Sequence, residues 1–147
     1  MNIIIFGPPG AGKGTQAKNL VEKLKSFQVS TGEMLRDEIK KDTEIGKKII
    51  NHMNEGKFVE DEIVNKLLEK IIFDKEKKNK LIFDGYPRTV NQAKNLENLL
   101  NKSNQKLDFI FFLNVKKETI IKRIEKRKIL ENRSDDESNT ILKRYDI

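Results

Sequence analysis

Four short apolar runs divide the chain, at residues 3–6, 27–29, 81–83 and 109–115. Between them, apolar residues return every three or four positions, which is the spacing of an amphipathic helix. Runs that are apolar throughout, instead of alternating with polar residues, are typical of parallel strands buried on both faces. The pattern therefore predicts an α/β domain with a central parallel sheet and helices on both of its faces.

Capping sequences place the starts of three helices. Ser30 with Glu33 and Ser134 with Glu137 have the spacing of a capping box, and so does the pair Thr89 and Gln92. Two short helices are predicted within residues 30–59, between consecutive strands, so this stretch is expected to form a small inserted subdomain. Residues 128–132 are predicted to be a short polar break before the last helix.

A glycine-rich segment, GPPGAGKGTQ at residues 7–16, follows the first apolar run directly. Its glycines let the backbone curl so that successive N–H groups face an anion. Lys13 adds a mobile positive charge at the start of a helix, whose dipole also favours a phosphate. The segment predicts binding of a nucleoside di- or triphosphate, although Gly14 stands where Ser or Thr usually follows the lysine.

Size and composition exclude several classes of protein. The 147 residues suit one domain, and the absence of cysteine excludes disulfides and a Cys-ligated zinc. No apolar run is long enough for a signal peptide core or a membrane span, so we expect a cytoplasmic protein without a membrane partner. The net charge of +7 comes mostly from lysines on helical patterns. Solvated helix faces explain it better than nucleic-acid binding does.

The arginines are few enough to suggest individual placement. A guanidinium is a rigid fork of donors that matches phosphate, whereas a lysine is a point charge. No positioned carboxylate base stands out in the sequence, which favours an acceptor that is itself an ionised phosphate. Asp84 ends an apolar strand, where a carboxylate would hold Mg²⁺ through water. The six arginines are Arg36, Arg88, Arg123, Arg127, Arg133 and Arg144.

Five motifs together resemble the adenylate kinase family in order and spacing. They are GPPGAGKGTQ, STGEMLR at 30–36, EGKFV at 55–59, DGYPRTVNQA at 84–93 and RSDD at 133–136. The resemblance also accounts for Gly14, because this family's loop has the sequence GKGT. It implies a P-loop NTPase-like, three-layer α/β/α fold. The core would be residues 1–29, 60–125 and 137–147, with a nucleoside-monophosphate-binding insertion at 30–59 and a short lid at 126–136.

The resemblance also implies roles for individual residues. Asp84 would orient Mg²⁺ through water, with Asp135 and Asp136 at the hinge of the lid. The implied ATP-binding residues are Gly10, Ala11, Gly12, Lys13, Gly14, Thr15, Arg123 and Arg127. The implied AMP-binding residues are Thr31, Arg36, Lys57, Phe58, Val59, Gly85, Tyr86, Pro87, Arg88, Gln92, Arg133 and Arg144. The implied catalytic residues are Lys13, Arg88, Arg127, Arg133 and Arg144.

These residues also have local interpretations. Thr31 and Gln92 could act only in helix capping, Asp84 only in a turn, and Arg144 only as a solvated helix residue. His52, the one histidine, is assigned no role.

The implied reaction is Mg²⁺-dependent transfer from ATP to AMP, giving two ADP, by a protein expected to be a monomer. A kinase for UMP or CMP is the nearest alternative, although Thr31 and Gln92 favour AMP. A nucleotide-binding module with little turnover is the second alternative, and a basic nucleic-acid binder is the third.

The resemblance raises one expectation about stability. The family normally continues past the position of Ile147 with a fifth core strand and a final helix. Without that strand, residues 109–115 become an uncovered edge, which favours aggregation. Each large side chain left exposed forfeits about 1.5–3 kcal/mol. We therefore expect the 147-residue polypeptide alone to be poorly stable and weakly active.

Overall fold

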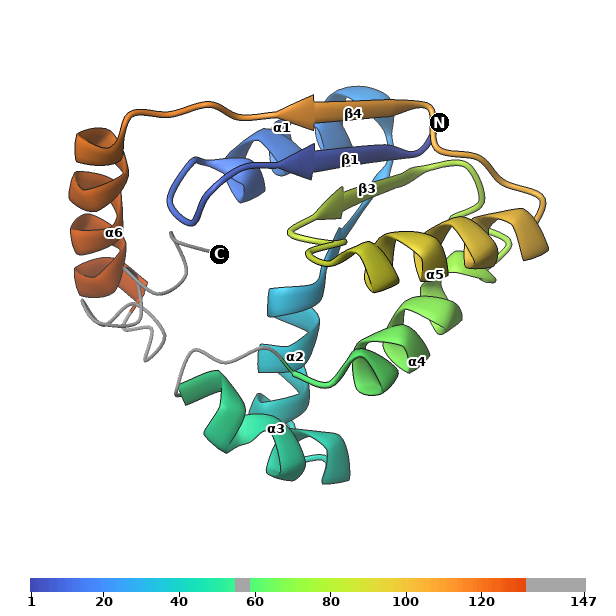
Figure 1. Cartoon of the computed structure of the whole chain (residues 1–147), viewed down its shortest axis with the longest axis horizontal. Coiled ribbons are helices and arrows are strands. Elements are labelled where there is room, and N and C mark those ends of the chain that lie inside the picture. The colour runs from blue at the N-terminus through green and yellow to red at the C-terminus, as the bar shows by residue number, and fades with distance from the viewer. Residues whose placement is uncertain (55–58, 132–147) are drawn as a thin grey trace.

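The computed structural model describes residues 1–54 and 59–131 and, within the last helix, side chains as far as Lys128 (Figure 1). Within that part of the chain, strands and helices alternate as the apolar pattern predicts. The strands are β1 (Ile3–Phe6), β2 (Phe27–Ser30), β3 (Leu81–Asp84) and β4 (Phe109–Phe112). The helices are α1 (Lys13–Leu24), α2 (Thr31–Lys40), α3 (Glu44–Asn54), α4 (Asp61–Ile72), α5 (Val90–Lys102) and α6 (Lys117–Glu131).

The four strands form one parallel sheet in the order β2-β3-β1-β4. The register pairs Ile4 with Phe83 on one side of β1 and with Ile110 on the other. All strands run the same way, so their carboxyl ends share one edge of the sheet. Figure 1 shows that α6 stands beyond this edge. The edge is where Asp84 and the glycine-rich loop after β1 lie.

Helices cover both faces of the sheet, which confirms the predicted three layers. On one face, Ile3, Ile5 and Ile82 pack with Ala17 of α1. On the other face, strand residues including Val29 and Phe83 pack with the buried sides of α2 to α5. Strands β1 and β3 have almost no exposed surface at their apolar positions except at Phe6, because each has a strand on both sides and helices above and below.

Strand β4 differs from the strands at the centre of the sheet, since all four of its side chains are exposed. Phe109, Ile110, Phe111 and Phe112 are 51%, 59%, 45% and 69% exposed. Phe109 and Phe111 stack on one face with their ring centroids 6.2 Å apart. Among the described residues β4 is the last strand of the sheet, which confirms that this apolar run forms an uncovered edge.

We expect Ile110→Lys to reduce aggregation of this chain severalfold. A lysine on an edge strand discourages pairing with another chain, because the added strand would bury its charge. Ile110 is already 59% exposed, so the free energy of unfolding should change by no more than about 0.5 kcal/mol. Light scattering during incubation at fixed protein concentration measures the effect. Val90→Lys, at an apolar residue 71% exposed on α5, is the matched control and should not slow aggregation.

Helix α6 corrects one prediction. Residues 128–132 were expected to break the chain, but α6 continues to Glu131. Residues 126–131 have the sequence KRKILE, which contains neither Gly nor Pro and is rich in good helix formers, so nothing there ends the helix. The expected lid at 126–136 therefore begins inside a helix. The capping box of Ser134 and Glu137 lies outside the described residues.

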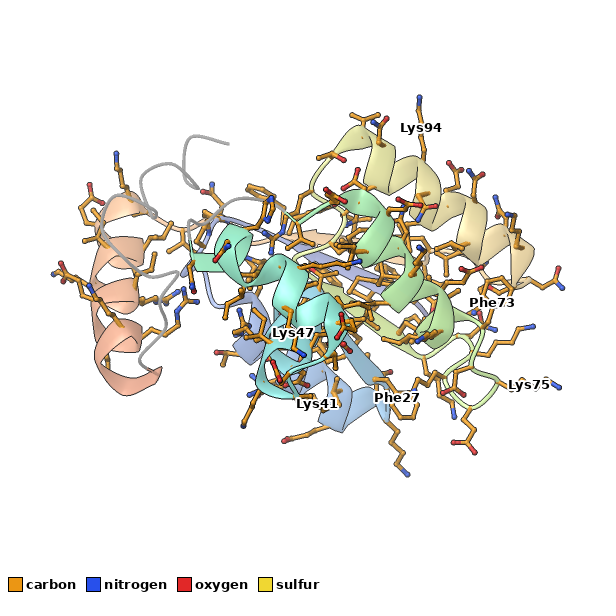
Figure 2. The ribbon with its side chains drawn as sticks, turned by 90° about the horizontal axis from the view of Figure 1, so that it is seen from below. Phe27, Lys41, Lys47, Phe73, Lys75 and Lys94 are labelled. Atoms are coloured by element: carbon orange, nitrogen blue, oxygen red, sulfur yellow. The ribbon has the colours of Figure 1, made fainter. Side chains whose placement is uncertain are left out.

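The lysines are arranged as solvated side chains. Figure 2 shows Lys94 of α5 and Lys75, in the turn region between α4 and β3, pointing away from the ribbon, and both are exposed. Several others make only surface contacts, such as Lys47 with Asp42 at 3.7 Å and with Glu44 at 3.6 Å. Of the helices in the described ranges, none has the length and apolar character needed to cross a membrane.

Candidate functional site

The glycine-rich loop joins β1 to α1 and curls around the start of the helix. Gly12 caps α1 with φ of 97°, a left-handed conformation that suits glycine. The side chain of Lys13 turns back over the loop, and its Nζ donates to the carbonyl oxygens of Gly7 at 2.8 Å and Pro8 at 3.0 Å. The ammonium group is thus held beside the backbone of the glycine-rich loop.

Lys13 lies in a charged cluster. Burial lowers the pKa of Lys13 from 10.5 to about 8. The Asp84 carboxylate opposes this shift, while the guanidinium groups of Arg88 and Arg127 lower the pKa further. Residues from three distant parts of the sequence, around positions 13, 84–88 and 127, are therefore close enough for the others to act electrostatically on Lys13. Such a cluster of cations is expected where a polyanion binds.

Asp84 faces the loop from the end of β3. Its Oδ2 accepts a hydrogen bond from Nε2 of Gln28 at 3.1 Å. A Cβ built on Gly14 would lie 3.4 Å from the same oxygen, so the small residue at position 14 leaves the carboxylate next to the start of α1. In the described part of the chain, no group of three His, Cys, Asp or Glu residues could hold a metal ion.

The donors at this edge fit a hydrated cation that arrives with a nucleotide. Mg²⁺ is commonly bound by one or two carboxylates, with substrate phosphates and waters as its other ligands. Asp84 supplies one carboxylate beside the loop, and the phosphates would supply the remaining charge.

Helix α6 packs against the loop from the other side. A Cβ on Gly10, where φ is +77°, would lie 2.7 Å from Cγ1 of Ile124, so α6 approaches the loop backbone closely. Ile120 and Ile124 are each 1% exposed in this contact. On the same helix, Arg123 donates from Nη1 to the carbonyl oxygen of Ala11 at 3.0 Å. The contact thus brings Arg123 to the glycine-rich loop and Arg127 near Lys13.

The turn after β3 brings a second group of predicted residues together. The carbonyl oxygen of Gly85 accepts from Nε of Arg88 at 2.7 Å and from Oγ1 of Thr31 at 3.4 Å. Arg36 lies one turn further along α2, and its Nη1 is 3.3 Å from the position of a Cβ on Gly32. The amino end of α2 therefore faces the Asp84–Arg88 turn.

Both capping boxes in the described ranges form the expected contact from the cap residue. The side chain of Ser30 accepts from the backbone N–H of Glu33 at 3.4 Å, and that of Thr89 accepts from Gln92 N–H at 3.1 Å. The local interpretation of Gln92 is thus partly right for its backbone. Its side chain accepts from the nearby backbone N–H of Arg88 and makes one long-range contact, to Asp61.

Several predicted residues have side chains in the core. Tyr86 is 1% exposed and Val59 is 6% exposed, and both belong to the main apolar cluster. Pro87 is also buried. These three residues therefore expose little surface to a nucleotide in this structure. Lys57, Phe58, Arg133, Asp135, Asp136 and Arg144 lie outside the described residues.

Two polar residues of this region were not singled out from the sequence, Gln28 and Asp61. Gln28 sits between Phe27 and Val29, so a polar residue inside an apolar strand was its available signal. Asp61 begins α4, where an acidic residue is ordinarily explained by the helix dipole. Only the fold shows that each contacts another residue of the candidate site.

Comparison with known proteins agrees with this arrangement. The sequence model of the family described as adenylate kinase matches residues 5–147. An adenylate kinase of Pelagibacter ubique is 55% identical over 84% of this chain and 58% of its own length. One of Mycoplasma mycoides is 50% identical over 86% of this chain and 59% of its own length. The chain thus spans less than two thirds of either relative.

The chain covers a larger share of a third relative. An adenylate kinase of Porphyromonas gingivalis is 41% identical over 100% of this chain and 76% of its own length. With the family match over nearly every residue, the P-loop and the parallel α/β sheet, this similarity is sufficient to assign the family. The chain belongs to the adenylate kinase family.

Proposed function

We propose that the protein transfers a phosphoryl group from ATP, bound with Mg²⁺, to AMP, and so forms two molecules of ADP. The observation that carries this proposal is the position of the Lys13 ammonium group, which donates to the loop carbonyl oxygens of Gly7 and Pro8 and is acted on electrostatically by Asp84, Arg88 and Arg127. Cations from the turn after β3 and from α6 are therefore near the lysine of the glycine-rich loop. That arrangement suits two phosphate chains that meet end to end.

Each group has a defined task in such a transfer. Loop N–H groups and Lys13 would hold the phosphates of ATP, and Lys13 would move with the transferred group. Arg88 would hold the phosphate of AMP against its repulsion by ATP, and Arg127 would offset charge in the transition state. Mg²⁺ would neutralise the phosphate oxygens, with Asp84 holding its water ligands.

We also propose the division of the chain that the resemblance implies. Residues 30–59, which include α2 and α3, would form the AMP-binding insertion, and the segment around 126–136 would form a short lid. Arg133 and Arg144 would join the phosphates from outside the described residues. Function as a monomer in the cytoplasm stays a prediction.

A coupled assay of ADP formation tests the proposal. AMP, CMP and UMP are compared as acceptors at equal concentration, with MgATP as donor. We expect AMP to be preferred strongly. Preference for CMP or UMP would support the pyrimidine alternative, and tight binding of a bisubstrate dinucleotide without ADP formation would support a binding module with little turnover.

The depressed pKa of Lys13 predicts a pH dependence of ATP affinity. Because the free protein loses the Lys13 proton near pH 8, while bound phosphates favour the charged form, ATP affinity should fall as pH rises. From pH 7 to pH 9.5 the fall should be on the order of tenfold. Titration with a fluorescent ATP analogue measures it. Lys13→Met, which has no ammonium group, should lack this step, and an equal fall in the variant would contradict the assignment.

The lowered pKa of Lys13 affects folding stability in the opposite direction to ATP affinity: its contribution to stability rises with pH. A lysine whose pKa is lowered by folding destabilises the folded state while it is charged. Between about pH 8 and 10.5 the unfolded chain binds this proton and the folded chain does not, so the Lys13 contribution to stability rises with pH. The weaker ATP binding at high pH would therefore not be a sign of unfolding at this site.

A further inference from the structure

The side-chain amide of Gln92 is held on both sides by protein groups. Its Oε1 accepts from the backbone N–H of Arg88 at 2.7 Å, and its Nε2 donates to Oδ1 of Asp61 at 2.6 Å. Gln92 is 5% exposed, so these partners and not bulk water determine its position. The bond to Asp61 joins the start of α5 to the start of α4, 31 positions apart in the sequence.

The two partners permit one orientation of the amide. A backbone N–H can only donate, and an ionised carboxylate can only accept. If the amide were flipped, its NH₂ group would face the N–H of Arg88 and its oxygen would face the carboxylate of Asp61. Both contacts would be repulsive. The orientation of Gln92 is therefore fixed by chemistry, with one donor hydrogen on Nε2 and one lone pair on Oε1 left over.

A second contact, through the Tyr86 hydroxyl, also links α4 to α5. The hydroxyl of Tyr86 lies 3.2 Å from Oδ1 of Asn65, one turn after Asp61, and 3.2 Å from the carbonyl oxygen of Gln92. Burial, with the nearby Asp61 carboxylate, raises the pKa of the Tyr86 phenol, so the hydroxyl remains a donor at neutral pH. The hydrogen bond from Gln92 to Asp61 is thus one of several contacts between α4 and the segment from Tyr86 to the start of α5.

The fixed amide distinguishes two kinds of purine. Adenine has an amino donor at position 6 beside ring nitrogens that accept, which matches a carbonyl oxygen and an NH₂ group side by side. A 6-oxopurine has an acceptor at position 6 and a donor on the neighbouring ring nitrogen, so it requires the amide to be reversed.

We propose that Asp61 is a positioning residue that locks the Gln92 amide in the orientation for a 6-aminopurine and so excludes 6-oxopurine monophosphates from the acceptor site. This inference rests on the proposed function and on the family resemblance, which implies that Gln92 belongs to the AMP site, where its side-chain amide would contact the base. It adds the residue that sets the selectivity of that contact.

Equilibrium binding of AMP and IMP to the 147-residue chain tests the inference without requiring turnover. In Asp61→Ala, AMP affinity should fall and IMP affinity should rise, so that the preference for AMP over IMP falls about tenfold, since the hydrogen bond to a charged group that fixes the amide is lost. Asp61→Asn keeps an acceptor oxygen and should recover most of the AMP affinity. Glu62→Ala removes a carboxylate from the same first turn of α4 and should match the unsubstituted protein. ATP affinity should be the same in all variants.

The outcomes separate this inference from the proposed function. If the unsubstituted protein does not bind AMP, the proposed function fails. If it prefers AMP to IMP and D61A keeps the same preference, Asp61 has no positioning role. Should D61A fail to fold, the side-chain amide resonances of Gln92 in the unsubstituted protein decide: one Nε2 proton resists exchange with water if Asp61 holds it, and fast exchange of both overturns the inference.

Discussion

Replacement of Lys13 by methionine is expected to lower kcat for ADP formation by roughly a hundred- to a thousandfold, the usual cost of removing one group that stabilises transition-state charge. Methionine keeps the length and apolar stem of the side chain and removes only the charge. ATP affinity should fall less than kcat, because the loop N–H groups and the dipole of α1 still bind the phosphates. Steady-state kinetics with MgATP and AMP, together with ATP titration, measure the two effects separately.

Stability should change little in this variant. Lys13 gives up two hydrogen bonds to loop carbonyls, but its depressed pKa shows that burial already disfavours the charged group. These effects oppose one another, so the melting temperature should move by only a few degrees. Lys18→Met, on the exposed side of the same helix, is the matched control and should retain full activity. Equal losses in both variants would show that Lys13 has no special role.

The sheet and the helix starts could be predicted from the sequence because their signals are local. Apolar runs located all four strands, and the capping boxes at Ser30 and Thr89 marked the starts of α2 and α5. The glycine-rich loop was equally local, since its conformation depends on a few consecutive residues. The strand order, in which β1 lies between β3 and β4, has no such local signal, because an apolar run does not specify which strands pair with it.

Contacts between elements could not be predicted in the same way. The hydrogen bonds from Gln28 to Asp84 and from Gln92 to Asp61 join residues 56 and 31 positions apart. No sequence pattern marks either pair as partners. The break expected at 128–132 failed because the polar residues there are also good helix formers, so polarity alone did not mark a loop. Composition does not show which helix face a neighbour covers.

A close packing contact between α2 and α3 illustrates the same limit. Gly46 in α3 had no signal as a special position, yet it is buried where α3 crosses α2. A Cβ built on Gly46 would lie 2.2 Å from the carbonyl oxygen of Glu38 and 2.8 Å from Cα of Ile39. Both atoms belong to the backbone, so no side-chain rotation can relieve the overlap.

We therefore expect Gly46→Ala to lower the free energy of unfolding by about 3 kcal/mol. Alanine gains up to about 1 kcal/mol over glycine in a helix, but overpacking against a rigid backbone costs typically 1–3 kcal/mol and occasionally more. At separations this short the packing cost should win, and α3 must move away from α2. Thermal unfolding followed by circular dichroism should show a fall of roughly 6–12 °C in Tm.

Gly32→Ala is the matched control, because it makes the same substitution inside α2. The nearest atom to a Cβ there is Nη1 of Arg36 at 3.3 Å, the end of a flexible side chain that can move aside. The free energy of unfolding should stay equal or rise by about 0.5 kcal/mol.

Because α2 also carries Thr31 and Arg36, Gly46→Ala should raise KM for AMP more than KM for ATP. An unchanged Tm in Gly46→Ala would mean that α2 and α3 do not cross as closely as this packing requires.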